Sequence, residues 1–227
     1  MENNLTGITK KEWEGLHSQE RFQPKYPSEH VVRFMFSQFS RDLKERGQLK
    51  ILDLGCGAGV HAIFLAKEGF CVYATDISET GLAVVKKRLL ENNLKAVVKN
   101  TSMESQPFED DFFDGAISFG VFYYNNREGY QKAVDELYRV LKRGGKVFIF
   151  TRTTDDYRFG KGKEIEKNTF VLDVPETNEK NMAMHFLDKE DINKIFSKFK
   201  EVEIEKTETT FSNLKNKNSD WIIKVKK

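Results

Sequence analysis

The chain has 227 residues, with 37 basic and 35 acidic side chains and a formal net charge of +2 at pH 7. This length can bury the core of one domain, and we expect a single domain over residues 1–227. The near balance of charge provides no broad positive field for a phosphate backbone, which disfavours nucleic acid as a partner.

Membrane insertion and secretion are also disfavoured. The sequence has no run of about 18 apolar residues that could span a bilayer, and Met1–Asn4 lacks the basic start and apolar stretch of a signal peptide. Cys56 and Cys71 are too few for a disulfide framework and lack metal-ligand company, so we expect reduced packing residues and no metal site. We therefore expect a cytoplasmic protein.

Residues 1–47 are predicted to form an N-terminal helical cap. Ser28 can cap a helix that ends at Gly47, and its apolar stripe comprises Val31, Val32, Met35, Phe36, Phe39 and Leu43. Residues 12–27 form an aromatic, irregular segment ahead of that helix. This segment either packs on the surface or covers a ligand pocket, and the sequence leaves both interpretations open.

Residues 48–152 alternate between apolar runs and helical patterns, which is typical of parallel strands joined by right-handed crossovers. We expect strands at 49–54, 71–76, 95–100, 113–119 and 145–152, and helices at about 59–68, 79–92 and 128–142. The fold class is therefore α/β, with a doubly wound, mostly parallel sheet and helices on both faces.

Residues 153–187 break this rhythm, because the stretch from Thr153 to Met184 is rich in charge and glycine. We expect a substrate-side insertion there. The remainder, 188–227, is expected to hold a helix near 188–198 and strands near 200–210 and 221–225, with a polar turn from Asn213 to Asp220 between the strands.

The most informative motif runs from Ile51 to Gly59, and the following strand ends at Asp76. Glycines at 55, 57 and 59 let the backbone turn sharply and let a ligand lie against bare main chain. A carboxylate at the end of the neighbouring strand is suited to accept hydrogen bonds from two ribose hydroxyls. The motif therefore predicts a nucleoside-containing cofactor.

Two cofactors are compatible with this motif. Gly57-Ala58-Gly59-Val60-His61-Ala62 satisfies the dinucleotide fingerprint in its alanine form, which would indicate a nicotinamide-dependent oxidoreductase. A fixed negative charge at Asp53 would harm a pyrophosphate site but favour a ligand carrying an ammonium or sulfonium group. S-adenosylmethionine carries both cations, so we favour it.

The pattern Asp-x-Gly-x-Gly-x-Gly over residues 53–59 resembles the first motif of the class I, seven-stranded, Rossmann-like S-adenosylmethionine-dependent methyltransferases, and in particular the type 11-like domains for small molecules. The resemblance runs from about Leu49 to Phe150. It implies a seven-stranded sheet with a C-terminal antiparallel hairpin. It also implies that a nucleophile on a small-molecule acceptor attacks the sulfonium methyl in line with the departing sulfur.

The resemblance also implies a set of cofactor-binding residues. Ile77 would offer an apolar side chain to the adenine, Ser102 stands where the family usually has an acid for the adenine amino group, and the main chain at Phe119 would face the methionine part. The full set is Asp53, Gly55, Cys56, Gly57, Gly59, Asp76, Ile77, Ser102, Met103, Phe119 and Gly120.

The acceptor side is less defined, and no catalytic residue is assigned. A general base is needed only where the acceptor loses a proton as it attacks. Arg152 and Arg158 beside Tyr157 would suit an anionic substrate, or they belong to a solvated loop. The candidates, all beyond the fourth strand, are Tyr123, Tyr124, Arg152, Tyr157, Arg158 and His185.

Three alternatives stay open at this point. They are a nicotinamide-dependent oxidoreductase, a protein that binds S-adenosylmethionine without catalysis, and a nucleic-acid methyltransferase if residues 152–163 form a basic patch. The sequence does not identify the methyl acceptor, its attacking atom or the oligomeric state.

Overall fold

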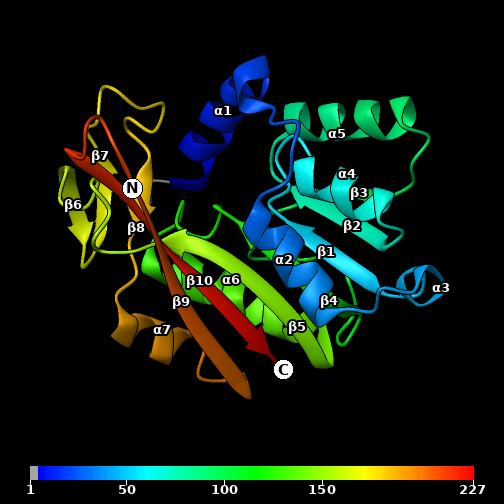
Figure 1. The fold of residues 1–227 in the computed structure, drawn as a ribbon. Coiled ribbons are helices and arrows are strands. Elements are labelled where there is room, and N and C mark those ends of the chain that lie inside the picture. The colour runs from blue at the N-terminus through cyan, green and yellow to red at the C-terminus, as the bar shows by residue number, and fades with distance from the viewer. Residues whose placement is uncertain (1–4) are drawn as a thin grey trace.

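The computed structural model describes residues 5–227, and side chains from residue 10 onward, so the expectation for Met1–Asn4 lies outside the described part. One seven-stranded sheet dominates the fold (Figure 1). Its strands are β1 Lys50–Leu54, β2 Cys71–Asp76, β3 Val97–Asn100, β4 Phe113–Phe119, β5 Leu141–Arg152, β9 Glu201–Phe211 and β10 Asn216–Lys226.

The strand order is β3-β2-β1-β4-β5-β10-β9. The first five strands in the chain pair in parallel, whereas β10 runs antiparallel to both β5 and β9. This confirms the predicted α/β class with its C-terminal hairpin. The order reverses between β1 and β4, so the carboxyl ends of these strands open onto the crevice where such sheets bind ligands.

Helices cover both faces of the sheet. On one face lie α2 Glu29–Gln38, α4 Val60–Lys67 and α5 Glu79–Glu91, and their buried side chains form one core cluster with the sheet. On the other face, α6 Arg127–Val140 and α7 Lys189–Ile195 form a second cluster. Side chains cap three of these helices at their first turn: Ser78 on α5, Asn126 on α6 and Asp188 on α7.

The N-terminal region differs from the prediction in two places. Residues 12–17 are helical, because they belong to α1 Leu5–His17, which precedes the short η1 Glu20–Phe22. The helix expected to run to Gly47 ends at Gln38, and a separate α3 spans Leu43–Arg46. The break arises because Asp42 accepts hydrogen bonds from the amides of Lys44 and Glu45 and starts a new helix.

The insertion contains a second, three-stranded antiparallel sheet formed by β6 Gly162–Glu166, β7 Thr169–Leu172 and β8 Ala183–His185. These strands are only three to five residues long, and β6 is charged, so the sequence pattern did not reveal them. They have their own apolar cluster, which includes Phe170, Met184 and Phe186 and packs against Tyr123.

The last turn is shorter than predicted. Backbone with positive φ is found at Ser212, Asn213 and Leu214, and pairing of β10 with β9 already begins at Asn216. The polar residues that suggested a longer turn are inside the strand because two of them, Ser219 and Asp220, are buried against the loop after β5. In the described residues, no helix is long and apolar enough to cross a membrane.

Candidate active site

A cavity of about 600 Å³ lies at the carboxyl ends of β3, β2, β1 and β4. Its floor is made by the segments that follow these strands: Gly55–Ala58 after β1, Asp76 and Ile77 at the end of β2, 101–104 after β3, and 119–121 at β4. In Figure 1, α1 lies beyond this edge of the sheet, between α5 and the three-stranded sheet. The cavity is therefore at the predicted crevice.

The glycine turn shapes the floor of this cavity. Gly57 has φ +52°, and a Cβ there would lie 3.2 Å from the Nε2 of His17. Gly59 has φ +79° and starts α4 in the left-handed conformation, where a Cβ would crowd Val85. Gly55, Cys56 and Gly57 line the cavity, whereas Gly59 positions the helix below it.

Asp76 lies at the cavity wall and is held by two main-chain donors. Its Oδ2 accepts from the Gly57 amide and its Oδ1 from the Ser78 amide, each at 2.8 Å. Burial raises the pKa of this carboxyl above its ordinary value, against the two amides, which lower it. Each carboxylate oxygen has a second acceptor position, so both can still accept from ribose hydroxyls.

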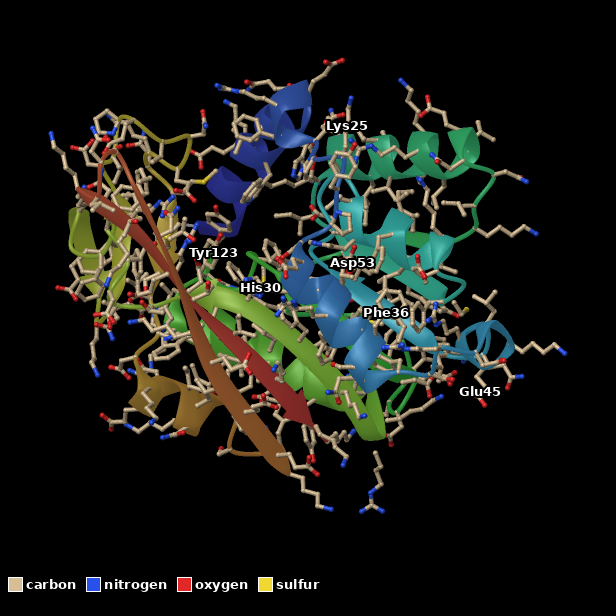
Figure 2. All side chains as sticks on the ribbon, viewed as in Figure 1. Lys25, His30, Phe36, Glu45, Asp53 and Tyr123 are labelled. Carbon is tan, nitrogen blue, oxygen red and sulfur yellow. The ribbon has the colours of Figure 1, made fainter. Side chains whose placement is uncertain are left out.

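Asp53 behaves differently from the expectation. Figure 2 labels Asp53, which belongs to β1. Its side chain is buried and does not line the cavity, and its Oδ2 has no hydrogen-bond partner among the described residues. Burial raises its pKa to about 7. A fixed negative charge at Asp53 facing a cationic ligand is therefore not supported, because the side chain does not line the cavity and its carboxyl is about half protonated at pH 7.

The side of the cavity where adenine is expected is formed by Ile77 and by the loop after β3. Ser102 and Met103 both line it, as predicted for cofactor contacts. Sequence reasoning missed Glu104, which also lines the cavity and accepts a hydrogen bond of 3.0 Å from the Asn125 amide. The sequence gives no signal for Glu104, because its hydrogen-bond partner Asn125 lies beyond β4 and only the fold brings the two together.

The β4 end of the cavity is aromatic. Phe119 and Gly120 line it, and the Phe119 ring stacks on Phe150 with centroids 4.4 Å apart. His61 lies against Phe119, and its Nε2 accepts from the Ser28 main-chain amide at 3.2 Å. Burial lowers the pKa of His61 to about 4, so the ring is neutral.

A cover closes the cavity from the N-terminal side, which resolves the question about residues 12–27. Trp13, His17, Phe22, Pro24 and Tyr26 all line the cavity. Two attachments to α5 hold this cover. The Glu14 carboxylate accepts from the main-chain amides at the start of α5. The Arg88 guanidinium of α5 donates to the main-chain carbonyls of Gln23 and Pro24 in the cover, and also to that of Ala58 after the glycine turn.

Of the six acceptor-side candidates, only Tyr124 lines the cavity, and its hydroxyl donates to Glu179 at 2.7 Å. Tyr123 is buried toward the three-stranded sheet (Figure 2). Tyr157 packs edge-on against Phe211. His185 is fully buried, shares a 2.7 Å hydrogen bond with the Thr169 hydroxyl, and has a pKa lowered to about 4 by burial.

Both candidate arginines are paired with acids away from the cavity. Arg152 is 2.7 Å from Asp220, and Arg158 is 3.0 Å from Asp156 and 2.5 Å from Glu179. Carboxylates thus balance both charges, and the expectation that these arginines present cations to an anionic substrate stays a prediction. Asp220 and Glu179 are distant in the sequence from the arginines they pair with, whereas Asp156 is two residues from Arg158. Arg158 also donates to the Asn218 side chain in β10, which joins the insertion to the hairpin.

Comparison with known proteins supports the predicted resemblance over the cofactor-binding core. Residues 51–145 match the family model described as a methyltransferase domain. These residues are similar to methyltransferase domains, as the predicted resemblance implies. The match runs from β1 to the first part of β5, while the cover and the three-stranded sheet lie outside the matched residues.

Similar curated proteins include methyltransferases. A ubiquinone/menaquinone biosynthesis C-methyltransferase from Zymomonas mobilis is 36% identical over 118 residues, covering 51% of this chain and 48% of that protein. A demethylmenaquinone methyltransferase from Clavibacter sepedonicus is 41% identical over 101 residues, covering 44% of this chain and 40% of that protein. The chain thus spans less than half the length of these two relatives.

Solved structures share the fold over most of the chain. An S-adenosylmethionine-dependent methyltransferase from Methanosarcina mazei has a TM-score of 0.71 at 21% identity, covering 89% of this chain and 98% of that one. The 1,6-didemethyltoxoflavin-N1-methyltransferase of Burkholderia thailandensis has a TM-score of 0.72 at 12% identity, covering 98% and 88%. At these identities the likeness concerns the class I methyltransferase fold.

Proposed function

We propose that this chain transfers a methyl group from S-adenosylmethionine to a small-molecule acceptor. The observation that carries the proposal is the arrangement at the carboxyl ends of β1 and β2, where a bare glycine turn and the Asp76 carboxylate share one cavity wall. When bound, S-adenosylmethionine supplies an electrophilic methyl group on a sulfonium. The methyltransferase domain match supports the same activity.

The residues present fit this cofactor. Asp76 would accept from the ribose hydroxyls, and Ile77 and Met103 would pack on the adenine. The main chain of the glycine turn and of Phe119–Gly120 would hold the methionine part. The chain therefore contributes positioning, which accounts for much of the rate acceleration in a displacement reaction.

The cover provides the second contribution, which is exclusion of water. Trp13 packs edge-on against Tyr124 with ring centroids 4.7 Å apart, so the cover meets the loop after β4 across the cavity. A site closed in this way protects a reactive sulfonium from solvent. For acceptors that must lose a proton, Tyr124 and Glu104 are the proposed polar groups, because both line the cavity.

A small-molecule acceptor is supported by the partly covered cavity of about 600 Å³ and by the names of similar proteins, which refer to ubiquinone, menaquinone and toxoflavin chemistry. We do not assign any of those compounds to this chain. The arginines that suggested an anionic acceptor are neutralised by acids, so the proposal does not extend to an anion. Two unpaired cysteines support the proposed cytoplasmic location, where thiols stay reduced.

The test is methyl transfer from methyl-labelled S-adenosylmethionine into a fractionated small-molecule extract, followed by mass spectrometry. The proposal predicts a labelled product and S-adenosylhomocysteine, both formed by the wild type and lost in Asp76→Ala. A protein that binds S-adenosylhomocysteine but forms no product with any fraction would instead be a non-catalytic binder. That outcome would contradict the proposed activity.

A further inference from the structure

His17 is the last residue of α1, and the docked cover brings it to the nucleoside side of the cavity. Its Nε2 would be 3.2 Å from a Cβ on Gly57, the residue whose amide binds Asp76. Its Nδ1 would be 2.8 Å from a Cβ on Gly81, in the first turn of α5. The imidazole is therefore wedged between the glycine turn and the helix that follows Asp76.

Several contacts fix the imidazole in this place. Trp13 stacks on it, with ring centroids 5.4 Å apart and an interplanar angle of 28°. The Gln23 amide donates to the His17 carbonyl at 2.8 Å. Glu14, one turn earlier, anchors α1 to the amides of Glu79 and Thr80. The ring is thus held rigidly, as a preorganised ligand contact requires.

The hydrogen-bonding capacity of this ring is not used by the described residues. Among the described residues, the buried Nδ1 has no hydrogen-bond partner, and Nε2 forms no hydrogen bond either. Burial lowers the pKa of His17, while Asp76 and Glu14 raise it, and the net direction is downward. The ring is therefore neutral near pH 7, with one N–H donor and one acceptor nitrogen.

We propose that His17 is a cofactor-binding residue that holds a ribose hydroxyl together with Asp76. This inference rests on the proposed function. A carboxylate only accepts hydrogen bonds, so a hydroxyl that donates to Asp76 keeps its own acceptor lone pairs. In either tautomer the imidazole can form a hydrogen bond with that hydroxyl. The ring lies beside Gly57, whose amide donates to Asp76. The nucleoside is then held between the sheet and the cover, and binding requires α1 to be docked.

The test compares S-adenosylhomocysteine with its 2′-deoxy and 3′-deoxy analogues by titration calorimetry, in the wild type, His17→Phe and His17→Gln. His17→Phe keeps an aromatic ring against Trp13 but removes both nitrogens, whereas His17→Gln keeps a hydrogen-bonding amide. His30→Phe is the matched control, because His30 lies outside the cavity and stacks on Phe150. Thermal melts confirm that each variant is folded.

The proposal predicts that the wild type binds one of the two deoxy analogues more weakly than S-adenosylhomocysteine. This loss of affinity, the deoxy penalty, should be about fivefold smaller in His17→Phe, because one neutral hydrogen bond contributes about that factor. His17→Gln should retain part of the penalty, and His30→Phe all of it. If both deoxy penalties are unchanged in His17→Phe, the ring only packs the cover and the inference is overturned. A wild type that does not bind S-adenosylhomocysteine at all would instead contradict the proposed function.

Discussion

Replacing Asp53 with Asn is expected to stabilise the fold at alkaline pH. Asp53 is 1% exposed, and burial raises its pKa from 3.8 to about 7. Between these two values the carboxyl is protonated in the folded chain and ionised in the unfolded chain. The folded state therefore binds the extra proton, and the free energy of unfolding falls as the pH rises through this window.

The magnitude follows from the width of the window. Within the window the free energy of unfolding falls by about 1.4 kcal/mol for each pH unit. The full shift of roughly three units therefore removes about 4 kcal/mol of stability above the folded pKa. Asn has almost the same volume and cannot ionise, so Asp53→Asn removes this loss. The difference in stability between the variant and the wild type should grow by roughly 3 kcal/mol from about pH 5 to about pH 8.

Urea unfolding of both proteins at several pH values measures this difference directly, since the other titrating groups cancel. Asp173→Asn, which replaces an exposed acid of the insertion, is the control and should follow the wild type. Parallel stability profiles for the wild type and Asp53→Asn would refute the reasoning, because the carboxyl would then be ionised in the folded protein. Since Asp53 does not line the cavity, affinity for S-adenosylhomocysteine should change less than in Asp76→Asn.

Three further substitutions test the cavity. Asp76→Ala should weaken S-adenosylhomocysteine binding about tenfold or more through lost ribose contacts, and wild-type affinity in calorimetry would contradict the ribose assignment. Gly57→Val should abolish S-adenosylhomocysteine binding, because a branched side chain is disfavoured at φ +52° and crowds His17, while the circular dichroism spectrum stays native. Retained binding would show that the glycine turn does not hold the cofactor. Glu14→Gln should accelerate S-adenosylhomocysteine release a few-fold in stopped-flow measurements, since a charged acceptor at the start of α5 is lost. An unchanged release rate would mean that this attachment does not hold the cover.

Local patterns were sufficient to predict the sheet and the floor of the site. The bounds of β2 and β4 agree with the apolar runs at 71–76 and 113–119, because each run is buried and ends at a turn. The glycine turn and Asp76 could be predicted because both the backbone requirement and the acid are encoded in consecutive residues. Their mutual hydrogen bond follows from parallel pairing of β1 and β2.

What could not be predicted depends on contacts between distant residues. Arg158 appears as a free cation in the sequence, yet its partner Glu179 is supplied by the loop before β8. Asp53 appears as a charge beside the ligand, but its side chain points into the core, and only the packed fold raises its pKa. His17 carries no local signal, because its place beside Gly57 depends on how α1 docks on α5.

The most direct test of the proposed site is titration calorimetry of the purified protein with S-adenosylmethionine, S-adenosylhomocysteine, and oxidised and reduced nicotinamide dinucleotides side by side. We predict binding of the two adenosyl sulfur compounds and no binding of either dinucleotide. Binding of a dinucleotide alone would contradict the proposed function and would assign the glycine turn to a nicotinamide cofactor.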